Sequence, residues 1–243
     1  MDRDRQLAGQ TLLVIGGSSG IGLETARRAH REGASVIITA RDPEAVHRAG
    51  LELTASIAAF DATDFDRLGR FFAELPTRID HVLITVPGPH PPPLAQFNVD
   101  DARRALDAHL ILPLRVARAA SAKVRPGGAL LFTGCIVGGD SATGSAFICA
   151  LTAALSAMTK SLARELAPIR VNLIAAGFVD TPLSAEILGD EIDARREELR
   201  ETLPIRRVIK PADIAALAVH LMTNTAVTGA TFDIDGGQQL IEG

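Results

Sequence analysis

A glycine-rich segment, Gly16 to Gly22, lies between an apolar run at Thr11 to Ile15 and a helix-forming run at Leu23 to Arg31. Glycines in this position let the backbone approach a pyrophosphate closely, and the amino end of the following helix attracts the negative charge. A further apolar run at Ser35 to Thr39 completes a strand, loop, helix, strand order. We therefore predict a nucleotide site that includes Gly16, Ser18, Ser19, Gly20, Ile21 and Gly22.

Strand-like apolar runs alternate with helical stretches along the rest of the chain. Short, nearly continuous apolar strands separated by helices indicate a parallel sheet covered on both faces. The 243 residues, 47% of them hydrophobic, suffice for one sizeable core. We predict an α/β chain, residues 1–243, with a single-domain Rossmann fold and a doubly wound, mostly parallel sheet of about seven strands. The clearest strands are Thr11 to Ile15, Ser35 to Thr39, His81 to Val86, Ala129 to Thr133, Arg170 to Ile174 and Thr231 to Ile234.

A long helix is predicted from Cys149 to Leu166, where leucines and a methionine recur at three- and four-residue steps. This single apolar stripe is typical of a core or interface helix. A charged segment between Thr181 and Leu203 is interpreted as a solvated helix or as a mobile lid. The proline-rich stretch Pro87 to Pro93 follows a strand, so we expect it to shape one wall of the ligand pocket.

Charge and hydropathy exclude several partners. The formal net charge of -4 comes from interspersed acids and bases, which argues against nucleic acid. The first ten residues lack the apolar stretch of a signal peptide, and no run approaches roughly 18 uninterrupted apolar residues, so we expect no membrane contact and a cytoplasmic location. Cys135 and Cys149 form neither a disulfide framework nor a metal spacing and are interpreted as two small buried hydrophobic residues.

Arg41 ends the second predicted strand, where a dinucleotide-binding fold places the residue that contacts the adenosine ribose. A guanidinium can pair with a 2'-phosphate, whereas an acid would accept hydrogen bonds from a free 2'-hydroxyl. Arg41 therefore favours NADP(H) over NAD(H); the alternative is an exposed arginine in a turn. Asp61 follows the third strand and either caps the next helix or bonds the adenine.

Over essentially its whole length the chain resembles the short-chain dehydrogenase/reductase family. The resemblance implies a nicotinamide cofactor, a small-molecule substrate and a homo-oligomer, either a dimer or a tetramer built partly on the long helix. It also implies cofactor contacts from Asp61, Ala62, Val86, Gly88, Gly177, Val179 and Thr181. The matching segments are Gly16 to Gly22, Phe60 to Asp64, Gly127 to Leu131, Lys160 to Ala167, Ile169 to Asn172, Gly177 to Pro182 and Asp233 to Gly237.

The family's catalytic positions are not matched. The chain contains no tyrosine, although the family's proton donor is one. Aligned on the long helix, the tyrosine position falls on Ile148 and the lysine position on Thr152, while the serine and asparagine positions fall on Cys135 and His109. Loss of a positioned general acid typically slows a reaction by roughly 10² to 10⁴, so ordinary ketone reduction should be slow.

His109 and Cys135 are the remaining candidates for chemistry. His109 can titrate near neutrality and would act as the replacement acid; its alternative interpretation is a hydrogen-bonded histidine on a helix. Cys135 is either a nucleophile or a small substitute for serine. We keep three functions open: an NADP(H)-dependent oxidoreductase acting on a carbonyl, imine or activated alkene; an inactive cofactor-binding protein with a regulatory or structural role, including in a hetero-oligomer; and a non-redox dehydratase or cyclase.

Overall fold

A seven-stranded sheet forms the centre of the computed structural model, which describes residues 5–75, 78–85, 94–136 and 146–241. The strand order is β3-β2-β1-β4-β5-β6-β7, and every neighbouring pair is parallel, as the doubly wound prediction requires. The predicted fold class is thus confirmed. The strands are β1 (Thr11–Ile15), β2 (Ser35–Ala40), β3 (Ser56–Ala59), β4 (Ile79–Ile84), β5 (Val124–Cys135), β6 (Arg170–Ala176) and β7 (Thr231–Ile234).

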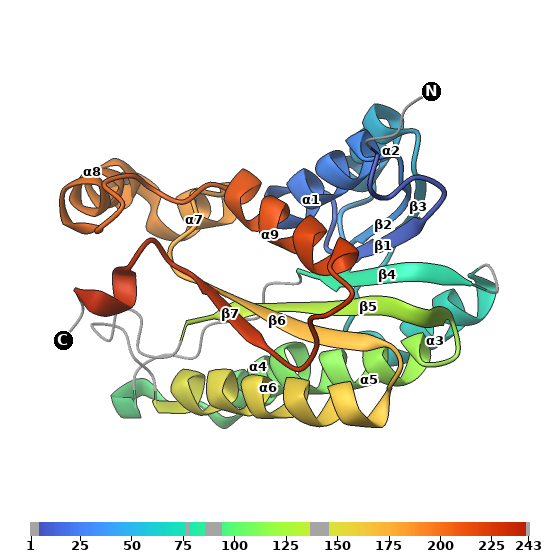
Figure 1. The fold of residues 1–243 in the computed structure, drawn as a ribbon. Coiled ribbons are helices and arrows are strands. Elements are labelled where there is room, and N and C mark those ends of the chain that lie inside the picture. The colour runs from blue at the N-terminus through green and yellow to red at the C-terminus, as the bar shows by residue number, and fades with distance from the viewer. Residues whose placement is uncertain (1–4, 76–77, 86–93, 137–145, 242–243) are drawn as a thin grey trace.

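Successive residues of β1 point to opposite faces of the sheet, as the two-residue period of a strand demands. Leu12 and Val14 belong to the buried cluster on one face, and Leu13 and Ile15 to the cluster on the other. Figure 1 shows the helices that cover these faces. On one face lie α1 (Gly20–Arg31), α2 (Pro43–Leu53) and α9 (Pro211–Thr223), and on the other α3 (Phe65–Glu74), α4 (Val99–Leu106), α5 (Leu112–Ala120) and α6 (Ala146–Glu165).

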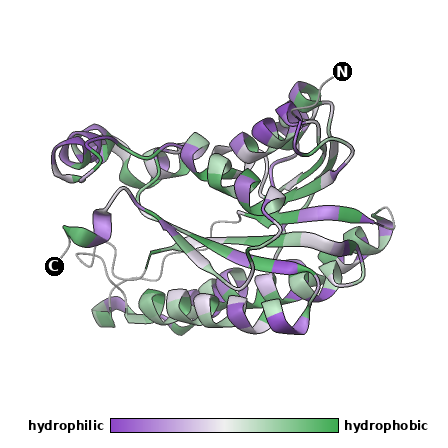
Figure 2. Cartoon of the chain, viewed as in Figure 1, coloured by the Kyte–Doolittle hydropathy of each residue, from purple (hydrophilic) through white to green (hydrophobic). Residues whose placement is uncertain are grey.

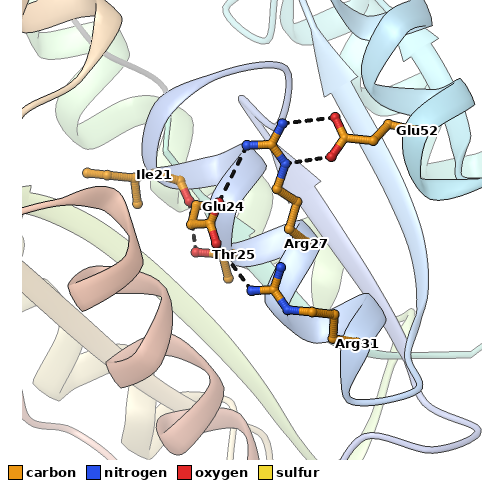
Figure 3. Close-up of polar contacts among 6 residues, drawn as sticks. All are labelled: Ile21, Glu24, Thr25, Arg27, Arg31 and Glu52. Atoms are coloured by element: carbon orange, nitrogen blue, oxygen red, sulfur yellow. Dashed lines mark hydrogen bonds and ion pairs between the residues drawn. The ribbon is translucent and has the colours of Figure 1, made fainter.

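Helix α1 begins at Gly20, three residues before the predicted start at Leu23. Charged side chains hold its outer face to α2 (Figure 3). Arg27 donates two hydrogen bonds to the Glu52 carboxylate, at 2.6 and 2.9 Å, while Glu24 accepts from both Arg27 and Arg31. Exposed pairs of this kind contribute little free energy each. Of these pairs, only Arg27 with Glu52 joins α1 to α2.

Helix α6 is long and apolar enough to cross a membrane by length and composition, with a mean hydropathy of 1.5 over an 18-residue window. An uninterrupted apolar run does not mark this helix in the sequence, because Lys160 and Arg164 interrupt the segment. A core helix passes the same test, and Leu151, Leu155 and Leu162 of α6 are buried. Only 22% of the window is buried, however, and the rest of it is half-buried or exposed.

The segment from Thr181 to Leu203 forms two helices, α7 (Pro182–Leu188) and α8 (Ile192–Thr202), beside the carboxyl ends of the strands (Figure 1). Helix α8 is mostly solvated, as predicted, but Leu199 is buried in a small cluster with Leu203 and Val208. Through this cluster α8 packs against the segment that follows it in the chain. Movement of the segment as a lid stays a prediction.

Candidate functional site

A cavity of about 240 Å³ opens at the carboxyl ends of β1, β2 and β4. It brings together nine residues predicted from the sequence: Gly16, Ser18, Ser19, Gly20, Ile21, Gly22, Arg41, Ala62 and Thr181. Seven further residues complete the lining: Ile15, Thr39, Ala40, Asp42, Phe60, Thr85 and Leu183. The glycine loop, the end of β2 and the start of α7 therefore face one space.

The glycine loop is packed too tightly for side chains at Gly16, Gly17 and Gly22. A Cβ on Gly17 would lie 2.6 Å from Cγ2 of Ile38. A Cβ on Gly22 would lie 2.2 Å from the carbonyl oxygen of Gly16 and 2.6 Å from Oγ1 of Thr85. Gly16 has a φ of +89°, and a Cβ there would lie 2.8 Å from the same hydroxyl. Gly20 has a φ of +52°, which favours glycine, and faces Thr181, whose side chain lies 3.6 Å from the position of an added Cβ. At these glycines the loop thus has room for the backbone alone.

The amino end of α1 is an electrostatically positive wall of this cavity. The first turn of a helix presents amides without partners inside the helix, and the first turn of α1 contains no acidic residue. Ser19 is the N-cap residue, and within the described residues its side chain makes no capping hydrogen bond. The amides of Gly20, Ile21 and Gly22 and the hydroxyl of Ser19 are therefore arranged to bind an anion such as a phosphate.

Thr85, at the end of β4, holds the start of the loop in place. Its Oγ1 donates a 2.9 Å hydrogen bond to the carbonyl of Gly16, and its amide donates to Ile15. From the other side, the amides of Gly16 and Gly17 donate to the carbonyl of Thr39 at 2.9 and 3.0 Å. These bonds preform the loop. Sequence reasoning missed Thr85 as a site residue, although it lies near the carboxyl end of the predicted strand His81 to Val86, where the cavity edge was expected.

Arg41 is exposed and lines the cavity, next to Asp42, which caps α2 by accepting from the amides of Glu44 and Ala45. Asp61 lies close enough for the Arg41 charge to act on it. Burial works to raise the pKa of Asp61, but hydrogen bonds from Thr63 and the charge of Arg41 hold that pKa below its usual value.

The capping role predicted for Asp61 is wrong. Asp64 is the N-cap of α3, and it accepts a hydrogen bond from the amide of Arg67. Asp61 instead accepts from the amide and the hydroxyl of Thr63 at 2.8 and 2.7 Å, forming a local turn. Adenine recognition by Asp61 remains a prediction.

The wall opposite the glycine loop starts at Thr181, whose hydroxyl accepts from the amide of Ser184 and so caps α7. Val179 is buried and pairs with Ile209 in an isolated bridge. Gly177 packs against Gln238, whose Oε1 would lie 2.6 Å from an added Cβ. Neither Gly177 nor Val179 lines the cavity, so cofactor contacts from these two residues stay predictions.

His109 lies in a π-helical segment, Asp107–Ile111, between α4 and α5. Single π turns are rare and frequently occur at functional sites. The residue is half-buried, and its Nε2 atom is shielded from solvent. The imidazole therefore sits at an irregular point of an otherwise regular helix, and a role as proton donor remains a hypothesis.

Both cysteines are exposed, so their interpretation as buried hydrophobic residues is wrong. Cys135 ends β5, and Cys149 lies in the first turns of α6, whose outward surface is largely open. Although Cys135 is accessible, the protein packed around it raises the pKa of its thiol. A raised pKa disfavours the thiolate, which weakens the case for a nucleophile.

Several predicted residues lie outside the described part of the chain. These are Val86, Gly88 and the proline-rich stretch Pro87 to Pro93.

Ile148 and Thr152, the positions aligned with the family's tyrosine and lysine, lie one turn apart on α6, and both are half-buried. Sequence reasoning also missed Phe60 and Leu183 as lining residues, although Phe60 begins the matching segment Phe60 to Asp64 and Leu183 directly follows the segment Gly177 to Pro182.

Comparisons with known proteins identify the family of the chain. A family model described as enoyl-(acyl carrier protein) reductase matches residues 15–239. The chain is similar to dehydrogenase/reductase SDR family member 4 from Homo sapiens, with 30% identity over 98% of this chain and 90% of the relative. The solved structure of MalC reductase/Diels-Alderase from Malbranchea aurantiaca has a TM-score of 0.88 and 25% identity, covering 98% of this chain and 100% of that one. BdcA in complex with NADPH has a TM-score of 0.84 and 28% identity, covering 95% of both chains.

Proposed function

Because the chain belongs to the short-chain dehydrogenase/reductase family, we propose that it is an NADP(H)-dependent oxidoreductase with a non-standard active site. Its substrate is a small carbonyl compound, imine or activated alkene. The observation that carries cofactor binding is the cradle formed by Gly16 and Gly22, which a single added Cβ would fill. Such a cradle fits the close approach of a pyrophosphate to backbone amides.

The preference for NADP(H) rests on Arg41. Its guanidinium is exposed and lines the cavity at the end of β2, where its charge acts on the nearby Asp61. It is thus available to pair with a 2'-phosphate. The solved relative BdcA is in complex with NADPH, which supports the same choice.

The bound cofactor would supply a hydride. The remaining question is which group donates the proton that completes the reduction. The chain contains no tyrosine. A substrate that needs no enzymic acid for hydride addition, such as an iminium ion, suits this composition best. His109 is the proposed donor for a substrate that does need one, because histidine is the side chain most often used as a general acid.

We also propose a homo-oligomer with α6 in the interface. The supporting observation is an apolar helix of mean hydropathy 1.5 that is only 22% buried within one chain. Its exposed residues are small along one side, including Ala150, Ala153 and Ala157, which permits close helix packing. Light scattering of the purified protein tests the homo-oligomer, and a monomer would contradict it. Co-purification of an active relative with this chain would indicate a hetero-oligomer instead.

A non-redox use of the pocket is the second candidate. It is favoured by the likeness to MalC, which is described as both a reductase and a Diels-Alderase. A dehydratase or cyclase would retain the fold without hydride transfer. The third candidate is a cofactor-binding protein without catalysis, which the missing tyrosine favours.

One experiment separates these functions. The protein is mixed with NADPH and, in turn, with a ketone, a preformed iminium ion and an activated alkene, while NADPH oxidation and substrate disappearance are both followed. We expect NADPH oxidation, fastest with the iminium ion. Substrate loss without NADPH oxidation would favour the non-redox function, and NADPH binding without either change would favour the inactive protein.

A further inference from the structure

The ring of Phe60 joins the cofactor cavity to an aromatic group in the core. Phe60 directly follows β3 and lines the cavity, and its amide donates a 2.9 Å hydrogen bond to the carbonyl of Ala40 at the end of β2. The ring packs against the buried Phe71 of α3, with 5.1 Å between the two centroids and 44° between the ring planes. Phe60 is therefore held beside Arg41 at the edge of the cavity.

Arg67 covers the same ring. The central carbon of its guanidinium lies 5.4 Å from the centroid of Phe60, which is within the range of a cation–π contact. The backbone of Arg67 is fixed in the first turn of α3, because its amide donates to the N-cap residue Asp64. Within the described part of the chain, the cavity lining includes Phe60 but not Arg67. The guanidinium thus reaches the ring from outside the cavity.

Arg67 lies at the border between the two faces of α3. Leu68, Phe71 and Phe72 are buried in the cluster that packs on the sheet, whose strands are mainly hydrophobic (Figure 2). The side chain of Arg67 is 33% exposed, and it forms an ion pair with Glu74 at 3.7 Å. A surface pair of this kind contributes little free energy. The contact with Phe60 is therefore the more specific of the two interactions that Arg67 makes.

The phosphate positions of the proposed cofactor determine which residues meet its adenine. The amides at the start of α1 take the pyrophosphate, and Arg41 takes the 2'-phosphate, so the ribose of the adenosine lies between these two positions. Beyond Arg41 the cavity is lined by Phe60 and Ala62, which follow β3 at the neighbouring strand end. These two residues remain for the base.

We propose that Arg67 is a positioning residue for the adenine end of the cofactor site, acting by fixing the Phe60 ring against which the base packs. This inference rests on the proposed function, because it needs NADP(H) in the cavity. Contact between a base and an aromatic side chain changes affinity by about fivefold to 150-fold. A cation over a partly exposed ring is worth about two- to fivefold. Loss of Arg67 should therefore cost less affinity than loss of Phe60.

The test measures the binding of two probes by calorimetry. Adenosine 2',5'-bisphosphate carries the base, whereas inorganic pyrophosphate reaches only the amino end of α1. We expect Arg67→Met, which keeps an unbranched apolar stem without the charge, to weaken the bisphosphate about two- to fivefold and to leave pyrophosphate unchanged. Arg67→Lys restores a cation and should recover most of the affinity. In a Phe60→Ala background, Arg67→Met should have no further effect, because the ring through which it acts is gone.

The pair formed by Arg115 and Phe65 is a matched control. The guanidinium carbon of Arg115 lies 5.1 Å from the Phe65 centroid, and neither side chain belongs to the cavity lining in the described ranges. Arg115→Met removes the same charge from above a phenylalanine ring of the same helix, α3. This variant should change the affinity for neither probe.

Three results would overturn the proposal. The first is unchanged bisphosphate affinity in Arg67→Met. The second is equal weakening of both probes, which would make the effect one of overall charge or folding. The third is an additive loss in the double variant, which would show that Arg67 acts independently of Phe60. A wild type that binds neither NADPH nor the bisphosphate would contradict the proposed function itself, whereas normal NADPH binding with any of the three results overturns the role of Arg67 alone.

Discussion

Gly22 packs against Gly16 so closely that a methyl group on its α-carbon would lie 2.2 Å from the Gly16 carbonyl oxygen. Real side chains do not approach a backbone oxygen at that distance, so the contact excludes every residue except glycine. Gly16 directly follows β1, and Gly22 lies in the first turn of α1. Their contact sets the position of the helix amides that face the cavity.

The substitution Gly22→Ala should therefore damage both stability and cofactor binding. Overpacking of this kind costs about 1–3 kcal/mol, and we expect NADPH binding to be lost because the loop must move. The control is Gly69→Ala on α3, where an added Cβ meets nothing within 4 Å. That variant should gain about 0.5–1 kcal/mol. Thermal unfolding and NADPH titration check both variants; normal NADPH affinity in Gly22→Ala would show that the loop tolerates a side chain.

Arg196 on α8 holds the wall that carries Thr181. Its Nε and Nη2 atoms donate to Oδ1 of Asp180 at 3.1 and 2.7 Å, one residue before Thr181. In Arg196→Ala we expect faster amide hydrogen exchange across α8 and NADPH affinity lowered about two- to fivefold. Arg200→Ala is the control, because Arg200 pairs only with Glu197 of the same helix among the described residues. Equal behaviour of the two variants would remove Arg196 from the positioning of this wall.

His81 should make stability depend on pH. Burial lowers its pKa to about 4, with Asp80 opposing the shift and Arg170 and Arg125 adding to it. The unfolded value is about 6.5, so between about pH 6.5 and 4 the unfolded chain binds a proton that the folded chain does not. The free energy of unfolding therefore falls as pH falls through this window, by about 3 kcal/mol.

Urea unfolding at pH 7 and pH 4.5 measures this dependence in the wild type and in His81→Gln. The Nε2 atom of His81 lies 2.7 Å from Oε1 of Gln10, so the neutral imidazole donates this bond, and a glutamine amide can also donate. We expect the variant to lose clearly less stability on acidification. An identical loss in both proteins would mean that other groups carry the pH dependence.

His109 is expected to matter for turnover and not for cofactor affinity. With a substrate that requires protonation, His109→Ala should abolish NADPH oxidation while the dissociation constant for NADPH stays unchanged. The variant His109→Asn keeps a polar side chain but cannot titrate, so it should also lose the pH dependence of the rate. Full turnover in either variant would exclude His109 as the proton donor.

Patterns local in the sequence predicted the fold well. The apolar runs identified β1, β2, β6 and β7 to within two residues of their observed ends, because buried parallel strands carry continuous apolar stretches. β3 gave a weaker signal, since it pairs only with β2 at the edge of the sheet and is largely exposed. The glycine loop was equally predictable, because its glycines follow one another within one short segment between a predicted strand and a predicted helix.

Features that depend on distant parts of the chain could not be predicted. Thr85 meets Gly16 only because β4 lies next to β1, and Thr181 meets Gly20 only through the packing of α7. The five residues of the π-helical turn at His109 carry no pattern that distinguishes them from an ordinary helix, although Pro113, four residues after His109, cannot donate a backbone hydrogen bond to it and was a local sign of an irregular helix. The exposure of Cys135 and Cys149 likewise follows from where β5 ends and from how little of α6 is covered.

The most direct test of NADP(H) binding is a fluorescence titration of the wild-type protein with NADPH and, separately, with NADH. The chain contains neither tryptophan nor tyrosine, so the signal of the nucleotide itself can be followed. We expect NADPH to bind at least about tenfold more tightly than NADH, and Arg41→Ala to remove this difference by weakening NADPH alone. Arg48→Ala, an exposed arginine on α2, should change neither affinity. Equal affinity for the two nucleotides in the wild type, or binding of neither, would contradict an NADP(H)-dependent enzyme.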